Sequence, residues 1–379
     1  MVIPARFMPN TRRNGQLQMS EMIPGAATPD RGLTQIPLST YAPRRSIRRP
    51  LTEIDRLAVP SVDVHNHLGR WLSHDGTWMA PDLDDLLALM ERRNVETIVN
   101  LDGRWGAELD ENLARLDHAY PGKFVTFCHL DWSRLHESNP TELLIADLRR
   151  AKDQGARGLK VWKDLGLNIT DASGQLVLPD DPRLTEVFIA AGEVGLPILI
   201  HTADPVAFFE PLDRHNERLD ELGEMPSWWF GSDQFPTFDR LMQALADVVR
   251  RAPGTTFIGA HVGCAAEDLD WVSALMDECS NFHADLGGRL GELGRQPRRF
   301  ARLVERHPDR ILFGTDCFPP EDDAIITYAR FLETDDECFD YSPGAEIPPQ
   351  GRWDISGAAL PPHLLEKVYR GNALRILNS

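Results

Sequence analysis

Short apolar runs recur along the chain from residue 62 to residue 316, and their length and β-branched content predict buried strands. Polar segments separate these runs and repeat apolar residues at steps of three and four, which is typical of helices lying on a sheet. The clearest predicted helices cover residues 82–94, 141–155, 181–195 and 296–310. The predicted strands are VDVHNH (62–67), VETIVNL (95–101), FVTFCHL (124–130), GLKVW (158–162), PILIHT (197–202), TFIGAH (256–261), NFHADLG (281–287) and ILFGTD (311–316).

This alternation of strands and helices predicts one α/β domain over residues 59–379, a (β/α)8 barrel of the TIM type. The competing architecture is an open doubly wound sheet, which normally carries a Gly-rich phosphate loop after its first strand. No such loop follows residues 62–67, so we predict the barrel.

The first 58 residues differ from the rest, because they are rich in Pro, Arg, Ser, Thr and Gly and lack sustained periodicity. They predict an irregular leader or arm that is partly extended or disordered. The alternative is an arm that wraps a neighbouring subunit, with the basic pairs of YAPRRSIRRP docked on an acidic body.

The acidic composition limits the partners of this chain. A formal net charge of −18 argues against nucleic acid or an anionic membrane, since both require a basic face. The five cysteines show no C-x-x-C spacing, no apolar run approaches the ~20 residues of a membrane span, and no apolar stretch suggests a signal peptide. We therefore expect a cytoplasmic protein with a small-molecule partner. The basic leader, as an arm onto a neighbouring subunit, further suggests a homodimer or higher homo-oligomer.

Polar residues gather where the predicted strands end. Side chains alternate along a strand, so His65 and His67 should point the same way, and Asp63 with them. Because the carboxyl ends of all barrel strands meet at one face, we expect the strand-end residues to share one site, namely His65, His67, Lys160, His201, His261 and Asp316. Imidazole and carboxylate suit a divalent cation such as Zn²⁺, so the sequence predicts a metal site.

These motifs resemble the amidohydrolase superfamily, and within it the amidohydrolase-related branch (amidohydrolase 2) that includes aminocarboxymuconate-semialdehyde decarboxylase and pyrone dicarboxylate lactonase. The resemblance covers about residues 60–379 and also includes the closing segment VYRGNALRIL. It implies that His65, His67 and His201 are metal ligands. Asp316 would be both a ligand and the proton-transfer group.

The resemblance leaves two roles open. His261 would either complete a second metal position or polarise the substrate. Lys160 would bridge two metals only if its amine is carboxylated, and otherwise would pair with a nearby carboxylate. One ion is favoured over two, with Zn²⁺ as the first expectation and Mn²⁺ as the second.

The resemblance implies a hydrolase that attacks an amide, ester or lactone of a small, carboxylated or cyclic molecule through a metal-bound water. The first alternative is a decarboxylase or hydratase of the same branch, in which Asp316 would protonate carbon. Some of those decarboxylases begin with Glu-x-His, so the His65-x-His67 pair favours hydrolysis. The second alternative is a catalytically silent, metal-binding barrel.

Arginine and tryptophan residues near strand ends are candidates for substrate binding. Arg289 would clamp a substrate carboxylate, although a surface ion pair is the alternative. Arg70, Trp71, Arg104 and Trp162 are further candidates. The long segment 202–239 carries several aromatic residues and predicts a pocket wall or lid, or else a subunit contact. The histidines at 118, 129, 136, 215 and 307 are interpreted as surface or structural residues.

Overall fold

The structure is a computed structural model that describes residues 37, 41, 46–48 and 50–378. The chain divides into two units, Met1–Arg48 and Arg49–Ser379, and the second contains almost all of the described residues. Most of the predicted leader lies outside the described residues, so its character stays a prediction. Its described residues from 50 onward belong to the second unit, where the hydroxyl of Thr52 donates to Asp336 (2.9 Å) and Leu57 is buried.

Each predicted apolar run overlaps one strand of the second unit. All neighbouring strands are parallel, in the orders β1-β2-β3 and β4-β5-β6-β7-β8. The strands are β1 (Ser61–Asn66), β2 (Val95–Asn100), β3 (Phe124–Thr126), β4 (Leu159–Val161), β5 (Ile198–Ile200), β6 (Phe257–Gly259), β7 (Phe282–Asp285) and β8 (Ile311–Leu312).

Backbone hydrogen bonds join the two sheets at both seams. Beyond β3, the N–H of Lys160 donates to the carbonyl of Cys128 (2.7 Å). On the other side, the N–H of Asp316 donates to the carbonyl of His65 (2.8 Å). These bonds complete a ring of eight parallel strands, so the predicted barrel is confirmed.

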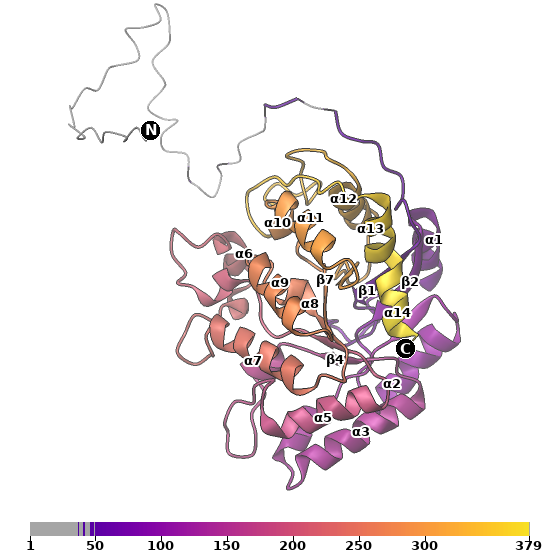
Figure 1. The fold of residues 1–379 in the computed structure, drawn as a ribbon, viewed down its shortest axis with the longest axis vertical. Coiled ribbons are helices and arrows are strands. Elements are labelled where there is room, and N and C mark those ends of the chain that lie inside the picture. Colours follow the sequence, from indigo (N-terminus) through magenta and orange to yellow (C-terminus); the bar gives the residue numbers. More distant parts are fainter. Residues whose placement is uncertain (1–36, 38–40, 42–45, 49, 379) are drawn as a thin grey trace, which may run out of the picture. The chain divides into compact units, whose positions relative to one another are not determined.

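Helices follow the strands and pack on their outer side, and neighbours such as α3 and α5 contact each other (Figure 1). The helices of eight or more residues are α1 (Leu83–Arg93), α2 (Gly106–Leu113), α3 (Pro140–Gln154), α5 (Pro182–Glu193), α7 (Phe238–Arg251), α9 (Leu269–Glu278), α11 (Pro297–Arg306) and α12 (Asp322–Glu333). The shorter ones are α4 (Asp164–Leu167), α6 (Leu219–Glu224), α8 (Ala260–Gly263), α10 (Leu290–Leu293), α13 (Pro362–Glu366) and α14 (Asn372–Leu377). No described helix is long and apolar enough to cross a membrane.

Local sequence signals explain where the helices begin and end. The carboxylate of Asp82 accepts the N–H groups of Asp84 and Asp85 at the start of α1, and Asn94 ends that helix in the left-handed region (φ 63°). Proline occupies the first turn of α3, α5 and α11, where its missing N–H costs nothing. The four clearest predicted helices are therefore present within a few residues of their expected bounds.

A β-bulge interrupts β1 just before the site. Asp63 pairs with Ile98 and Asn66 pairs with Asn100, so β1 advances three residues while β2 advances two. The extra residue reverses the alternation of side chains along the strand. The bulge therefore decides which residues of β1 face the barrel axis.

The bulge corrects one expectation about β1. His65 and His67 both turn inward, as predicted, but Asp63 does not point with them. Its carboxylate lies between β1 and the segment after β8, where it accepts the N–H (2.9 Å) and the hydroxyl (2.7 Å) of Thr315. Burial raises the pKa of Asp63 to about 6 in spite of these hydrogen bonds. Asp63 thus anchors the segment that carries Asp316.

Apolar side chains fill the barrel below the site. They form a cluster with α14, made of Val62, Val64, Val99, Leu101, Phe127, Leu199, Ile258, Ala260, Leu312, Ala373, Ile376 and Leu377. On each contributing strand these residues precede the polar residues of the site, as Leu199 precedes His201. Since α14 contacts β1 and β8, it closes the amino-terminal end of the barrel and leaves the carboxyl end to the polar residues.

Candidate metal centre

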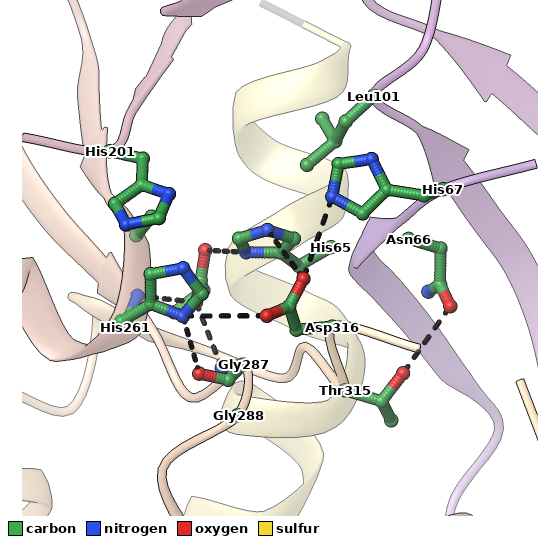
Figure 2. A network of polar contacts seen from close by, with 12 residues as sticks. His65, Asn66, His67, Leu101, His201, His261, Gly287, Gly288, Thr315 and Asp316 are labelled. Carbon is green, nitrogen blue, oxygen red and sulfur yellow. Dashed lines mark hydrogen bonds and ion pairs between the residues drawn. The ribbon is translucent and has the colours of Figure 1, made fainter. Parts of the chain in front are cut away.

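Three of the predicted ligands converge on one point (Figure 2). Nε2 of His65 lies 3.2 Å from Oδ1 of Asp316, and Nε2 of His67 lies 3.5 Å from the same oxygen. Metal–ligand distances of about 2.0–2.2 Å place the ligand atoms of a tetrahedral site roughly 3.3–3.6 Å apart. The spacing of these three atoms therefore fits the coordination shell of one small divalent cation.

Buried carboxylates hold the far side of both β1 histidines. Nδ1 of His65 lies 2.9 Å from Oδ2 of Asp285, and Nδ1 of His67 lies 2.6 Å from Oδ1 of Asp102. A neutral imidazole that donates its Nδ1–H in this way presents the lone pair of Nε2. Both rings are therefore held in the orientation that a metal ligand needs, and a cation that displaces any proton on Nε2 would meet the required tautomer.

The charge of the site is balanced around Asp316. Burial raises its pKa, but the contacts of the carboxylate with His65 and His261 outweigh burial and hold that pKa well below its usual range. Burial likewise lowers the pKa of His67, yet the charge and hydrogen bond of Asp102 raise it to about 9. Without a cation, a proton on His67 thus compensates the carboxylates that surround it.

His261 lies in a strained turn rather than at a strand end. The strand β6 stops at Gly259, two residues earlier than predicted, and α8 is a left-handed turn in which His261 and Val262 have φ values of 59° and 60°. Such a conformation costs about 1–3 kcal/mol for a residue with a side chain and is found mainly at functional sites. Asp316 has the same kind of backbone (φ 59°). This left-handed backbone conformation directs the side chains of His261 and Asp316 over the mouth of the barrel.

Asp285 ties this turn to the rest of the site. Its Oδ1 accepts the N–H groups of His261 (3.0 Å) and Gly287 (2.9 Å), while its Oδ2 holds His65. Nδ1 of His261 lies 2.7 Å from the carbonyl of Gly287, and because that carbonyl only accepts, the ring is Nδ1-protonated. His261 therefore presents the lone pair of its Nε2.

His201 follows β5 directly and lies beside His261, with their ring centroids 4.3 Å apart. Its Nε2 is buried and has no hydrogen-bond partner among the described residues, although Oδ1 of Asp204 is 3.3 Å away. Burial lowers the pKa of His201 to about 3, so the ring is neutral. A buried, neutral imidazole also fits a metal site, which it would meet through the nitrogen that Asp204 does not approach.

Lys160 lies next to the converging ligands. Its side chain is 1% exposed, and Nζ is 3.5 Å from Nε2 of His65. Burial lowers the pKa of Lys160 to about 8, against the charges of Asp316 and Asp285. No carboxylate of residues 50–378 lies within 4.0 Å of Nζ, so the expected alternative of a paired lysine has no partner in this part of the chain. Its bridging role stays a prediction.

A cavity of about 190 Å³ opens beside Lys160. It is lined by Arg104, Trp105, His129, Leu130, Asp131, Trp132, Ser133, Lys160, Trp162, Asp164 and Ile169. The indole of Trp71 packs edge-on against the rings of His129 and Trp162, with ring centroids 4.6 Å and 4.8 Å apart. Its centroid lies 6.2 Å from that of His67. Three substrate-binding candidates, Trp71, Arg104 and Trp162, are therefore brought together next to the ligands.

The other two candidates have different surroundings. Arg70 pairs with Glu111 and lies 4.6 Å over the ring of Trp78, so it is directed away from this cavity. Arg289 is 7% exposed and donates to the carbonyl of Gly288 (3.0 Å), which places it on the loop that also carries Gly287.

Two residues of the site were missed in the sequence. Asp102 and Asp285 both lie within two residues of the ends of predicted strands, so the rule that selected the histidines would have found them. His129, expected to be a surface or structural residue, is a buried part of the cavity wall whose Nδ1 accepts from Arg104 (3.2 Å), which agrees with the structural alternative.

Comparisons with known proteins agree with this geometry. The sequence matches the model of the family described as amidohydrolase over residues 62–378, which confirms the resemblance seen in its motifs. Among curated proteins, none matches it significantly.

Solved structures similar to this chain are barrels with low sequence identity. An uncharacterized TIM-barrel protein of Bordetella bronchiseptica matches with a TM-score of 0.53 at 14% identity, over 84% of this chain and 98% of that one. A 2,6-dihydroxybenzoate decarboxylase from Rhizobium matches with a TM-score of 0.52 at 16% identity, over 84% and 99%. A dihydroxybenzoic acid decarboxylase from Polaromonas sp. JS666, with bound manganese and 2-nitroresorcinol, matches with a TM-score of 0.53 at 15% identity, over 84% and 97%. At these identities the likeness establishes the fold alone.

Proposed function

The chain belongs to the amidohydrolase family, and on that basis we propose that it is a metal-dependent enzyme that hydrolyses an amide, ester or lactone of a small carboxylated or cyclic molecule. The observation that carries the proposal is the convergence of His65, His67 and Asp316, with a buried carboxylate behind each histidine.

His65, His67, His201 and Asp316 would hold one divalent cation, with Zn²⁺ or Mn²⁺ as the candidates. When bound, such a cation supplies positive charge that polarises a carbonyl and lowers the pKa of the water it contacts from 15.7 to about 7.

Asp316 is the proton-transfer group of this proposal. Its low pKa keeps the carboxylate ionised at neutral pH, so it can accept a proton from the attacking water and pass it to the leaving group. His261 shares the mouth of the barrel, with its Nδ1 3.9 Å from Oδ2 of Asp316. Because its Nδ1–H is committed to Gly287, its Nε2 can accept a hydrogen bond from the water but cannot donate one to an oxyanion.

The cavity beside Lys160 supplies the substrate preference. Arg104 and Lys160 bring two cations to its wall, and no described carboxylate forms an ion pair with either of them. A substrate carboxylate would compensate both charges, since partly buried cations without a partner are costly. Trp105 and Trp162 offer flat apolar faces to a ring, while Asp131 and Asp164 can accept from hydroxyl or amine groups.

Decarboxylation is the second candidate function, and the same cavity favours it. An aromatic acid bound between the indoles would bring its carboxylate toward the cations at the barrel mouth. There Asp316 would relay a proton from water or a substrate hydroxyl to the ring carbon as the bond to the carboxylate breaks and CO2 leaves. Two of the barrels similar to this chain are dihydroxybenzoate decarboxylases. Retention of the His65-x-His67 pair keeps hydrolysis as the first proposal.

One experiment separates these functions. Protein stripped with a chelator is reloaded with Zn²⁺ or Mn²⁺ and assayed on carboxylated lactones, esters and amides for acid release, and on hydroxylated aromatic acids for CO2. Metal-dependent acid release supports hydrolysis, whereas CO2 release from the aromatic acids would replace it with the lyase. Metal binding without turnover on any substrate of either class would favour the catalytically silent barrel.

A further inference from the structure

His201 has a buried carboxylate as its neighbour, as do the two histidines of β1. Asp204 follows it by three residues and brings Oδ1 to 3.3 Å from Nε2 of His201. The side chain of Asp204 is 7% exposed, and its Oδ2 forms an ion pair with Nζ of Lys163. Burial raises the pKa of Asp204, but Lys163 and His201 together hold it far below its usual range, so the carboxylate is charged.

Aromatic rings enclose the ammonium group of Lys163. Its Nζ lies 5.8 Å from the ring centroid of Trp162, 5.2 Å from that of Trp228 and 5.8 Å from that of Phe230. Cation–π contacts are strongest when the cation is desolvated, and the side chain of Lys163 is only 13% exposed. Trp228 and Phe230 belong to the long segment 202–239, so this segment fixes the position of the ammonium group.

We propose that Asp204 is a positioning residue for His201 and that Lys163 holds Asp204 in place. The inference rests on the proposed metal site, in which His201 is a ligand. Among the described residues no other group competes for Nε2 of His201, so Oδ1 of Asp204, at 3.3 Å, is the acceptor placed to take its N–H and orient the ring. The aromatic packing of segment 202–239 thereby sets the geometry of a metal ligand.

The arrangement resembles the two carboxylates behind His65 and His67. Removal of such a carboxylate weakens metal binding by about 10- to 100-fold while the ligand itself remains. It differs in the atom contacted. Asp285 and Asp102 approach Nδ1 of their histidines, whereas Asp204 approaches Nε2, so under this proposal Nδ1 of His201 is the nitrogen that would bind the metal.

The test is a titration of the metal-free protein with Co²⁺, followed by calorimetry and by the visible absorption of the bound ion. We expect Asp204→Asn and Lys163→Met to bind Co²⁺ about 10- to 100-fold more weakly than the wild type, with a changed absorption spectrum. Lys163→Arg retains a cation for Asp204 and should bind close to the wild-type affinity. Glu210→Gln removes one exposed carboxylate from the same segment and should leave binding and spectrum unchanged.

The outcomes separate this role from the metal site itself. Thermal unfolding of each metal-free variant shows that it is folded, and Lys163→Met tests the link from the other side if Asp204→Asn fails to fold. If Asp204→Asn and Lys163→Met both bind Co²⁺ as the wild type does while His201→Ala binds weakly, the role of Asp204 is overturned and the site stands. If His201→Ala also binds Co²⁺ as the wild type does, or the wild type binds no Co²⁺, both the ligand role of His201 and the positioning role of Asp204 are contradicted.

Discussion

Nδ1 of His67 lies 2.6 Å from Oδ1 of Asp102, and both side chains are buried. Oδ2 of Asp102 accepts the N–H of Gly69 (3.1 Å), so the carboxylate holds the ring and the chain just beyond it at the same time. This contact directs Nε2 of His67 toward Asp316 before any cation is present. The metal site is therefore organised by the protein, with Asp102 as one of its supports.

Asp102→Asn is expected to weaken metal binding by about 10- to 100-fold, because the amide supports the imidazole less well than the carboxylate does. The measurement is calorimetric titration of the metal-free variant with Zn²⁺. Asp110→Asn serves as the matched control, since Asp110 is exposed on α2 and contacts only Gln154 in this region. Equal affinities for the two variants would remove Asp102 from the account.

Asp316→Asn is expected to lower kcat by about 10²- to 10⁴-fold, the usual contribution of a general acid–base group. The substituted amide cannot take the proton from water, while the backbone bonds that anchor this segment remain. Steady-state kinetics on any substrate found for the wild type measures the loss, and circular dichroism checks the fold. Near-normal turnover by a folded Asp316→Asn variant would refute the assigned proton transfer.

The stability of the metal-free protein should fall as the pH rises from about 6.5 to about 9. The pKa of His67 is raised to about 9 in the folded protein, above its value of about 6.5 in the unfolded chain. Its contribution, on the order of 3 kcal/mol, is therefore complete below pH 6.5 and is lost as the pH passes through 9. Urea unfolding across this range measures it.

Asp102→Asn provides the control for that pH dependence, because it removes the charge that raises the pKa of His67. The difference in unfolding free energy between wild type and variant should shrink with rising pH. A constant difference would show that His67 does not carry the excess proton.

Arg104→Met is expected to raise KM for a carboxylated substrate by about 10- to 100-fold, because a charge-assisted hydrogen bond contributes roughly 1.5–3 kcal/mol. A neutral analogue of the same substrate should lose much less. Arg70→Met removes a guanidinium that pairs with Glu111 outside the cavity, and should leave KM unchanged. A uniform effect of both variants on both substrates would argue against carboxylate recognition by Arg104.

The strand-end rule predicts much of this site because parallel strands bring their carboxyl ends together. It places His65, His67, His201 and Asp316 correctly at the mouth of the barrel. It fails for Asp63, because the β-bulge in β1 adds a residue that no pattern of apolar and polar positions reveals.

Backbone strain and long-range packing also escape the sequence. A run such as TFIGAH reads as a strand through His261, yet the chain turns into the left-handed region after Gly259. The strand-end rule could have selected Asp102 and Asp285 as site residues, but they lie 35 and 220 residues from His67 and His65 in sequence, so only the closed barrel shows which histidine each one supports.

The most direct test of the metal site is the metal content of gently purified protein, measured by elemental analysis beside a His67→Ala variant. The account predicts about one Zn or Mn per chain in the wild type and its loss in the variant. About two per chain would instead assign Lys160 as a carboxylated bridge. No metal in the wild type, together with no binding of added Zn²⁺ or Mn²⁺, would contradict the metal site and the function proposed from it.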